Sequence, residues 1–519
     1  MANSDNTAAA APKRKQPTGL YLLFGAEAWE RFSYYGMRAI LVLYLCSTLM
    51  NFSKKDALSL YGVYTGLVYL TPLIGGFLAD RVLGARKAVI IGGVTMAIGE
   101  FCMAVPSLLF TGLALLILGN GFFKPNISNI VGGLYDDNDP RRDGGFTIFY
   151  MGINLGSFFS PLICGTLAAT YGFKWGFIAA GVGMIIGQVI FNLGTKHYRT
   201  GFPPDYKDAK PGAGLRAKDW LDILIYSVGV GVIVFVSQVL AKVIAPDNTT
   251  FCLPLSVIIT VLGTIAIYYS FCKKQTEESE SKKAEEVQED DSIKRYLGFT
   301  VEEWQRIAVI MILSCFVVFF WMGFEQAGGS MTLFAEQKTN RHLMGWEIPT
   351  SWFQSINPMV VCSFAPLFSM LWYAWDNSKY KIATPYKMAI GLFFLSAAFI
   401  VMYTGDCLVG YDASGNVTEG VSPIWLTMVY FLQTMGELCL SPVGLSMITK
   451  LAPAKITSVM MGVWFTASAV ANFLAGKLEY FLLSYNINMW YFLILSSAGA
   501  GALLLILSPK LKKWMHGRA

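Results

Sequence analysis

Long apolar stretches alternate with short polar ones along almost the whole chain. Each apolar stretch has about 18 residues or more, and an α-helix of that length crosses a hydrocarbon core of about 30 Å. This pattern predicts an all-α protein that crosses a membrane many times. Fourteen such helices are expected, at 20–48, 57–82, 88–106, 108–134, 145–171, 173–195, 219–243, 251–272, 305–335, 350–375, 384–404, 423–451, 456–484 and 488–508.

The fourteen predicted helices fall into three groups. Residues 1–200 hold six helices and form a predicted N-terminal bundle, and residues 305–519 hold six more and form a C-terminal bundle. Between them, residues 201–304 contain a loop with proline and glycine, two accessory helices without internal charges, and a charged linker at 273–291. Paired six-helix halves are typical of transporters whose substrate binds near the midplane between the halves.

Composition and charge also favour a membrane protein. Hydrophobic residues make up 54% of the chain and charged residues 14%, against about 25% charged in soluble proteins. The first 18 residues are polar, and the apolar run that follows is too long for a signal-peptide core and has no evident cleavage site, so the N-terminus is expected in the cytoplasm. An even number of helices returns the C-terminus to that side. Lys and Arg concentrate in the loops on that side, which accounts for the net charge of +6 without a nucleic-acid partner.

Cysteine and histidine usage excludes several kinds of site. The nine cysteines lie almost all inside apolar stretches and include no CxxC pair, so we expect small packed side chains and no metal site. The three histidines, at 197, 342 and 516, fall at or beyond helix ends, so proton chemistry within the membrane has to use carboxylates. No nucleophile with a matching base or metal set is evident, so we expect no enzyme.

The first predicted helix carries charges that lipid cannot accommodate. Each charge costs about 2.5–3.5 kcal/mol at membrane depth, so all of them must face protein or a watery cavity. Glu27 and Arg31 are four residues apart and are expected to pair, which leaves Glu30 as the acid freest to exchange a proton. Arg38 lies on the same helical face, and so does Tyr34. A purely structural buried network is the alternative.

The loop after the second helix has a pattern suited to conformational change. Gly75 and Gly76 permit two helices to approach closely, because glycine has no side chain. Asp80, Arg81 and Arg86 follow, and such charges can form contacts between helices that open and close with conformation. An ordinary cytoplasmic turn with positive-inside residues is the alternative.

Further polar residues interrupt later helices. Lys124 precedes a proline in the fourth helix, and a buried ammonium needs an anion from the protein or from a ligand. Without the accessory pair in the count, Glu325 lies in the seventh helix and Glu437 in the tenth. A carboxylate there must be paired, hydrated or protonated, as a proton-coupled step requires. A satisfied ion pair for Glu325 and a polar group at a helix bend for Glu437 are the alternatives.

Four segments together resemble the proton-coupled oligopeptide transporter family of the major facilitator superfamily. They match ExxER at 27–31, GGxxAD at 75–80 and FYxxINxGS at 149–157, with GNGFFKPN at 119–126 between them. The resemblance extends over about residues 18–510, and the accessory helix pair is similar to that of bacterial members. Some animal members carry a functional histidine on the second helix, and this chain has none there.

The resemblance implies a major facilitator fold of two six-helix bundles plus two accessory transmembrane helices. It further implies a symporter that imports di- and tripeptides with protons across the bacterial inner membrane by alternating access. Peptide-like drugs are additional expected ligands, and the proton is the only coupling species, with no metal or other cofactor. The residues implied in proton coupling are Glu27, Glu30, Arg31, Glu325 and Glu437.

The charges themselves favour a zwitterionic substrate. If the two halves are equivalent repeats, the fourth and tenth helices face each other, with Lys124 on one wall and Glu437 on the other. An extended dipeptide separates its charged ends by about 7 Å. We expect Arg38 and Lys124 to bind the carboxylate, and Glu437 with Asn357 to bind the amino terminus. The expected substrate-binding residues are Tyr34, Tyr35, Arg38, Tyr69, Lys124, Asn154, Trp321, Asn357, Glu437, Ser441 and Trp464.

Ion pairs between the halves are expected to hold one gate shut, formed by Lys124 or Arg38 with Glu325 or Glu437. A proton symporter of another small solute such as nitrate is the main alternative, although an anion-only site has no use for Glu437 unless that acid serves the proton alone. An uncoupled channel seldom needs paired halves. Peptide selectivity, proton stoichiometry, the role of the accessory helices and the oligomeric state stay open.

Overall fold

The computed structural model describes residues 15–136, 139, 141–203, 206, 212–244, 299–343, 345–376, 382–453 and 456–518. The predicted second accessory helix at 251–272 and the charged linker at 273–291 lie outside the described residues. Within the described part, ten helical segments are long and apolar enough to cross a membrane. The all-α, multispanning architecture expected from the sequence is confirmed.

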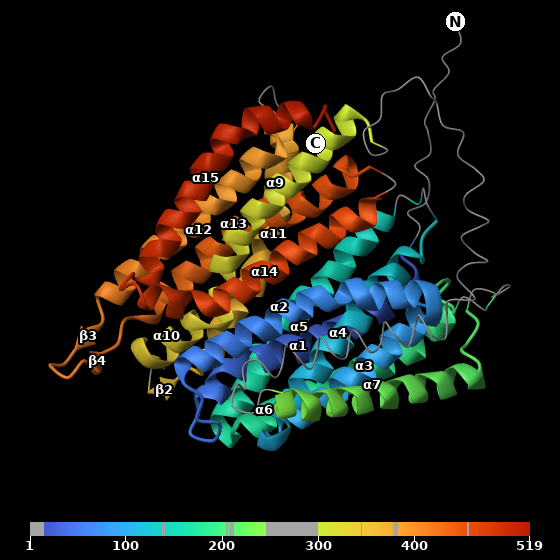
Figure 1. Ribbon diagram of the computed structural model, residues 1–519, viewed down its shortest axis with the longest axis horizontal. Helices are drawn as coiled ribbons and strands as arrows, with labels where there is room; N and C mark the ends of the chain where they lie inside the picture. Colours follow the sequence, from blue (N-terminus) through green and yellow to red (C-terminus); the bar gives the residue numbers. More distant parts are fainter. Residues whose placement is uncertain are drawn as a thin grey trace, which may run out of the picture.

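The first six long helices form one bundle around its own buried core (Figure 1). Apolar faces of these helices meet in the interior, and glycines let several pairs approach closely. The elements are α1 (Thr18–Cys46), α2 (Lys54–Leu78), η1 (Ala79–Leu83), α3 (Ala85–Met103), η2 (Pro106–Leu108), α4 (Leu109–Gly132), α5 (Arg142–Tyr171), α6 (Phe173–Leu193) and η3 (Gly194–His197).

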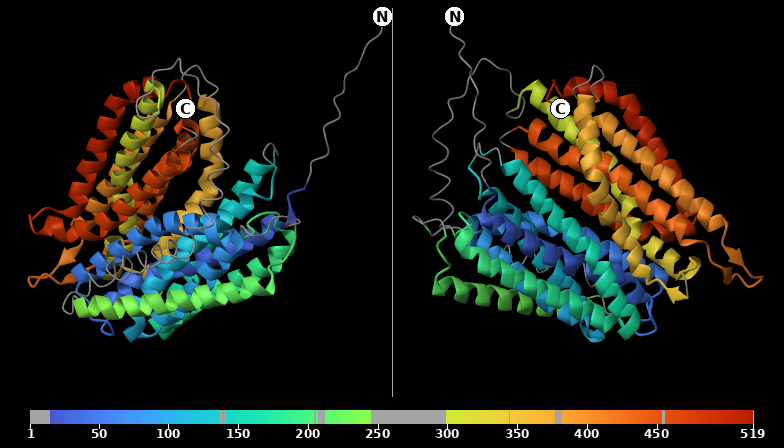
Figure 2. Two further views of the ribbon diagram at one scale, coloured as in Figure 1. Left: turned by 45° about the vertical axis from the view of Figure 1, so that its right-hand side comes forward. Right: turned by 180° about the vertical axis from the view of Figure 1, so that it is seen from behind.

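The accessory helix α7 (Ala217–Ile244) packs on the outside of this bundle against α3 and α4 (Figure 2). At its first turn, Lys87 Nζ of α3 lies 2.7 Å from an oxygen of Asp219 and 2.8 Å from one of Asp222. Much of the remaining α7 surface is apolar and exposed, as expected for a face in contact with lipid. The two charged contacts therefore fix one end of α7 to the N-terminal bundle.

The second bundle has a separate core and contains six long helical segments plus two short hairpins. The elements are α9 (Val301–Phe324), η4 (Glu325–Gly328), α10 (Ser330–Lys338), β1 (His342–Leu343), β2 (Trp346–Glu347), η5 (Thr350–Ser355), α11 (Ile356–Asp376), α12 (Thr384–Cys407), β3 (Gly410–Tyr411), β4 (Val417–Glu419), α13 (Pro423–Leu451), α14 (Thr457–Leu483) and α15 (Met489–Trp514). Strand β1 pairs antiparallel with β2, and β3 with β4.

The predicted continuous helix at 305–335 is broken. Helix α9 ends at Phe324, a tighter turn follows, and Gly329 takes a non-helical conformation before α10 resumes. The carbonyl of Ala327, which the break exposes, accepts hydrogen bonds from Thr332 Oγ1 at 2.8 Å and from Tyr430 Oη at 3.1 Å. Irregular backbone at membrane depth is stable only with such partners.

The two bundles touch at one end and diverge toward the other (Figures 1 and 2). We call the end that carries α10, η5 and the β1–β2 hairpin the closed end, and the opposite end the open end. At the closed end the backbones of α2 and α14 meet, because a Cβ at Gly62 would lie only 2.7 Å from Gly476 Cα. Hydrogen bonds between the bundles there include Lys54 Nζ to Gln337 Oε1 at 2.6 Å and Trp352 Nε1 to Thr166 Oγ1 at 2.9 Å.

Candidate functional site

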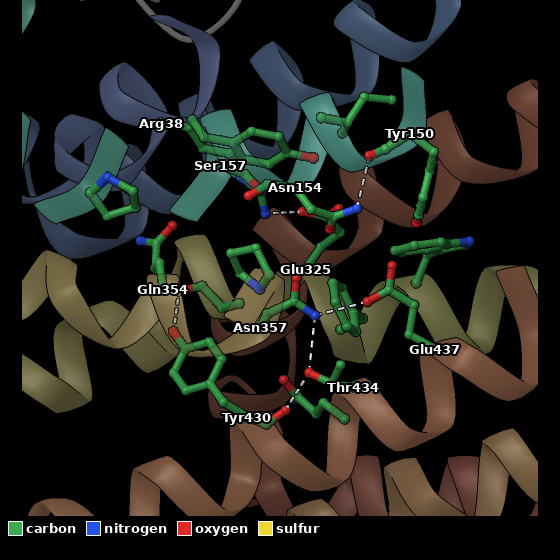
Figure 3. Close-up of a pocket in the computed structure, with 18 of the residues that line it drawn as sticks. Arg38, Tyr150, Asn154, Ser157, Glu325, Gln354, Asn357, Tyr430, Thr434 and Glu437 are labelled. Atoms are coloured by element: carbon green, nitrogen blue, oxygen red, sulfur yellow. Dashed lines mark hydrogen bonds and ion pairs between the residues drawn. The ribbon is translucent and has the colours of Figure 1, made fainter. Parts of the chain in front are cut away.

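A cavity lies between the bundles, next to the closed end (Figure 3). Helices α1, α2 and α5 form one wall, and α9, η4, η5, α11 and α13 form the other. The lining residues are Tyr35, Arg38, Tyr69, Tyr150, Ile153, Asn154, Ser157, Pro161, Trp321, Phe324, Glu325, Ala327, Gln354, Asn357, Pro358, Tyr430, Gln433, Thr434 and Glu437. Eight of them were expected from the sequence: Tyr35, Arg38, Tyr69, Asn154, Trp321, Glu325, Asn357 and Glu437.

A buried ion pair joins the bundles across this cavity (Figure 3). One nitrogen of the Arg38 guanidinium contacts a carboxylate oxygen of Glu325, and both side chains are almost fully buried. A second nitrogen, Nε, donates to Tyr61 Oη at 2.7 Å. Tyr61 in turn lies against Gly328, where a Cβ would come within 1.9 Å of the phenol oxygen. The pair between the halves that the sequence predicted is therefore present, as Arg38 with Glu325.

The opposite wall presents a carboxylate with fixed geometry. Asn357 Nδ2 donates to Glu437 Oε2 at 2.8 Å and to Thr434 Oγ1 at 3.0 Å. The Thr434 hydroxyl donates to the carbonyl of Tyr430 at 2.7 Å, one helical turn earlier on α13. Both amide hydrogens of Asn357 are thus used, and no hydrogen bond to its carbonyl oxygen is seen from the described residues, so this oxygen can accept from a ligand.

Glu437 and Arg38 therefore lie on opposite bundles around one cavity, which gives the two walls opposite charge. Lys124 adds to the positive side from α4, although it is not among the residues that line the cavity. Its ammonium lies 4.9 Å from the centre of the Tyr69 ring, and Tyr69 does line the cavity. The acids Glu27, Glu30 and Glu325 are all within electrostatic range of this ammonium.

The charged cluster on α1 is buried and compact. Arg31 makes a forked contact with both carboxylate oxygens of Glu30, one of them at 2.7 Å, and lies 3.3 Å from Glu27. Asn120 Nδ2 also donates to Glu30 at 3.3 Å. The expected pair of Glu27 with Arg31 is present, but in this conformation Glu30 is held more firmly than Glu27. The expectation that Glu30 is the freest acid is therefore wrong for this conformation, because the long side chains of the adjacent residues Glu30 and Arg31 fold toward each other.

The glycines near the end of α2 and the charges that follow it have two separate roles in the structure. Gly75 packs on the backbone of α4, where a Cβ would lie 2.0 Å from the carbonyl oxygen of Gly121, and Gly76 lies beside Pro125. Asp80 and Arg81 belong to the π-helical turn η1. Arg86 is buried and donates to three backbone carbonyl oxygens, those of Tyr198, Thr200 and Ala213. Arg86 thus anchors a loop of its own bundle, in contrast to the mobile ion pair expected.

Three further expected residues do not line the cavity. Trp464 is buried against α13, where a Cβ at Gly444 would lie 2.3 Å from its ring, on the side toward the open end. The hydroxyls of Tyr34 and Ser441 are buried without a hydrogen-bond partner among the described residues. Their functional roles, like those of the other expected residues, stay predictions.

Several lining residues were not expected from the sequence. They are Tyr150, Ser157, Gln354, Tyr430, Gln433 and Thr434. Helical spacing offered a signal for some of them, because Tyr430 and Thr434 precede Glu437 by seven and three residues and share its face. Tyr150 and Ser157 flank Asn154 in the same way on α5. Gln354 lies in the short helix η5, which no periodicity indicated.

A family described as the POT family matches residues 86–210 and 223–488 of this chain. Among curated proteins, the "Peptide transporter YePEPT" of Yersinia enterocolitica subsp. palearctica serotype O:3 (strain YE-P4) is 36% identical over 92% of this chain and 90% of its own length. A "Di-/tripeptide transporter" of Lactococcus lactis subsp. cremoris is 34% identical over 88% of each chain.

Among solved structures, the crystal structure of a peptide transporter POT in complex with sulfate has a TM-score of 0.76 and 34% identity, over 100% of both chains. A POT family transporter in complex with a thioalcohol conjugated peptide has a TM-score of 0.75 and 29% identity, over 96% of this chain and 97% of its own. The two-bundle fold described above is therefore shared with these transporters.

Proposed function

Because this chain belongs to the POT family, we propose that it transports di- and tripeptides across the bacterial inner membrane together with protons. The two relatives described above are named as peptide transporters, which favours peptides over other small solutes as the substrate. Import is the direction we infer, with both termini in the cytoplasm. Peptide-like drugs are included among the proposed ligands.

The observation that carries this proposal is the opposite charge of the two cavity walls. Arg38 on the N-terminal bundle, with Lys124 behind Tyr69, suits the carboxylate of a peptide. Glu437 on the C-terminal bundle, with the free carbonyl oxygen of Asn357, suits its ammonium group. A small anion such as nitrate would leave the acidic wall without a partner, which costs binding energy.

Alternating access follows from where the cavity is closed. The Arg38 to Glu325 pair joins the two bundles at the cavity that both residues line, so its rupture is required before the bundles can separate there. Removing one partner of a buried ion pair costs about 3–5 kcal/mol, enough to shift a conformational equilibrium strongly. We infer that a proton on Glu325, or a peptide carboxylate on Arg38, replaces this contact and links the solute to the opening step.

Uptake of labelled dialanine into proteoliposomes tests the proposal. With a pH gradient, acid outside, dialanine should accumulate above its external concentration, whereas counterflow without a gradient should only exchange it. Unlabelled di- and tripeptides should compete and nitrate should not. Accumulation that ignores the gradient would refute proton coupling, and competition by nitrate alone would refute the peptide site.

A further inference from the structure

A second cavity of about 620 Å³ lies between the bundles at the closed end. The ends of α1 and α5 line one side of it. Helix α10, the β1–β2 hairpin and η5 line the other side. None of the polar residues that line it belongs to the central cavity described above.

This outer cavity continues the central one beyond a thin layer of contacts. Gly165 of α5 lines the outer cavity, and Pro161, one turn earlier, lines the central one. Likewise, Ser351 of η5 lines the outer cavity and Gln354 of η5 lines the central one. The layer between them includes a hydrogen bond from Ser351 Oγ to the carbonyl of Pro161 at 3.1 Å. A solute that approaches from the closed end therefore meets the outer cavity first.

The outer cavity carries more acidic than basic groups among its described lining residues. Arg341 lies 3.1 Å from an oxygen of Glu336 and 2.8 Å from one of Glu347, and only 13% of its side chain is exposed. The two carboxylates remain 44% and 51% exposed. One partly buried cation thus contacts two half-exposed anions, and the Thr350 hydroxyl donates to the same Glu336 oxygen as Arg341. The three charged groups together carry a net negative charge.

An aromatic side chain, Trp346, lines the same cavity as these carboxylates. Trp346 is half exposed, and its ring centre lies 5.0 Å from that of Trp352, which fixes its orientation. Gly345, with φ of 81°, makes the tight turn that places Trp346 and Glu347 on the returning strand of the hairpin. A carboxylate pair next to an aromatic face suits an organic ammonium group, by charge and by cation–π attraction.

We propose that this outer cavity is a first binding site for the ammonium end, or a basic side chain, of a peptide that waits for the closed end to open. The proposal rests on the peptide transport proposed above. It assigns capture of substrate to Glu336 and Glu347, before the peptide reaches Glu437 in the central cavity. The binding energy of this site is that of half-exposed charge pairs. The site therefore raises the local peptide concentration and the rate of peptide entry more than the equilibrium affinity.

The test compares entry from outside with equilibrium binding. In cells that express the double variant Glu336→Gln/Glu347→Gln, we expect the KM for external dialanine to rise about three- to fivefold with Vmax unchanged. The rise should be larger for Lys-Ala and should shrink at about 0.5 M salt. The Kd of the purified protein for dialanine should stay within about twofold, because the central cavity is also reached from the open end. Glu419→Gln, an exposed acid of the β3–β4 hairpin, is the matched control.

A second variant keeps all contacts of Arg341 in place. Thr170→Lys puts a cation on the opposite wall of the outer cavity, and it should raise KM in the same way without disturbing the hairpin. Unchanged KM in both variants, or an equal rise with Glu419→Gln, would overturn the proposal. A parallel rise of KM and Kd would also overturn it, by placing the effect in the central cavity. Wild-type uptake in the same cells tests the proposed transport separately, since its absence would count against peptide transport and not against the outer cavity.

Discussion

The contact between α2 and α14 provides the sharpest test of the closed end. A Cβ added to Gly476 would lie 2.4 Å from the carbonyl oxygen of Leu58 and 2.6 Å from Gly62 Cα. Both are backbone atoms, so no change of rotamer relieves the overlap. Carbon atoms in contact normally lie about 3.5–4.0 Å apart, so the two helices must separate by about 1 Å.

This separation selectively destabilises the closed arrangement. Overpacking of a tight interface costs about 1–3 kcal/mol. In a conformation in which the closed end opens, the two helices are apart and the alanine costs nothing. Gly476→Ala should therefore shift the equilibrium between the two conformations by about 5- to 150-fold away from the one described here.

A distance measurement reads this shift directly. Spin labels at positions 54 and 337, whose native side chains touch at the closed end, should give a longer distance in Gly476→Ala than in the wild type, with native cysteines replaced in both. Gly499→Ala on α15 is the control, because nothing lies within 4 Å of the added Cβ and the gain in helix propensity is the same. An unchanged distance distribution with normal uptake would refute the argument that this glycine contact sets closure.

Three further predictions concern the charged groups. Glu30→Gln should lower gradient-driven dialanine uptake while counterflow largely survives, and loss of both would instead indicate a structural role for the α1 cluster. Lys124→Ala should weaken the binding of dialanine about tenfold but leave the binding of dialanine amide unaffected, as measured by competition. Equal effects on both ligands would show that Lys124 does not recognise the carboxylate. Lys87→Met should lower the melting temperature because it leaves Asp219 buried without its cation, and adding Asp219→Asn should restore much of the loss; no restoration would contradict the docking of α7 through this pair.

Much of the fold could be predicted because lipid imposes simple rules. Helices must be long and apolar, so the approximate ranges of most helices that the structure describes follow from the sequence. Charged residues inside them must face the interior, which is why Arg38, Glu325 and Glu437 were correctly expected near a shared cavity. For these residues, the cost of exposure to lipid exceeds any other local preference.

What could not be predicted depends on contacts between distant segments. The helix break after Phe324 is stabilised by Thr332 and by Tyr430 from another helix. No local sequence pattern therefore predicted the break. Arg86 was expected to form a mobile ion pair, but its partners are backbone carbonyls. Every residue has a backbone carbonyl, so no sequence pattern indicates such partners. The firm hold on Glu30 likewise depends on Asn120, a residue 90 positions away.

The helix break also connects the two walls of the central cavity. The break begins at Glu325, the partner of Arg38 in the gate. Two residues later, the carbonyl of Ala327 accepts from the hydroxyl of Tyr430, which lies on the same face of α13 as Glu437. A rearrangement at Glu325 that moves this carbonyl must therefore either move Tyr430 or break its hydrogen bond.

From Tyr430, an unbroken set of hydrogen bonds reaches the carboxylate proposed to bind the peptide ammonium. The Tyr430 carbonyl holds the Thr434 hydroxyl, which orients the Asn357 amide, which in turn donates to Glu437. Physical continuity alone does not establish energetic coupling, which requires an element with two arrangements that both sites bias. The broken helix is the element that contacts both sites, because Glu325 at its turn pairs with Arg38 and its Ala327 carbonyl accepts from Tyr430. The Arg38 to Glu325 ion pair and the hydrogen bonds that orient Glu437 thus meet at one structural element.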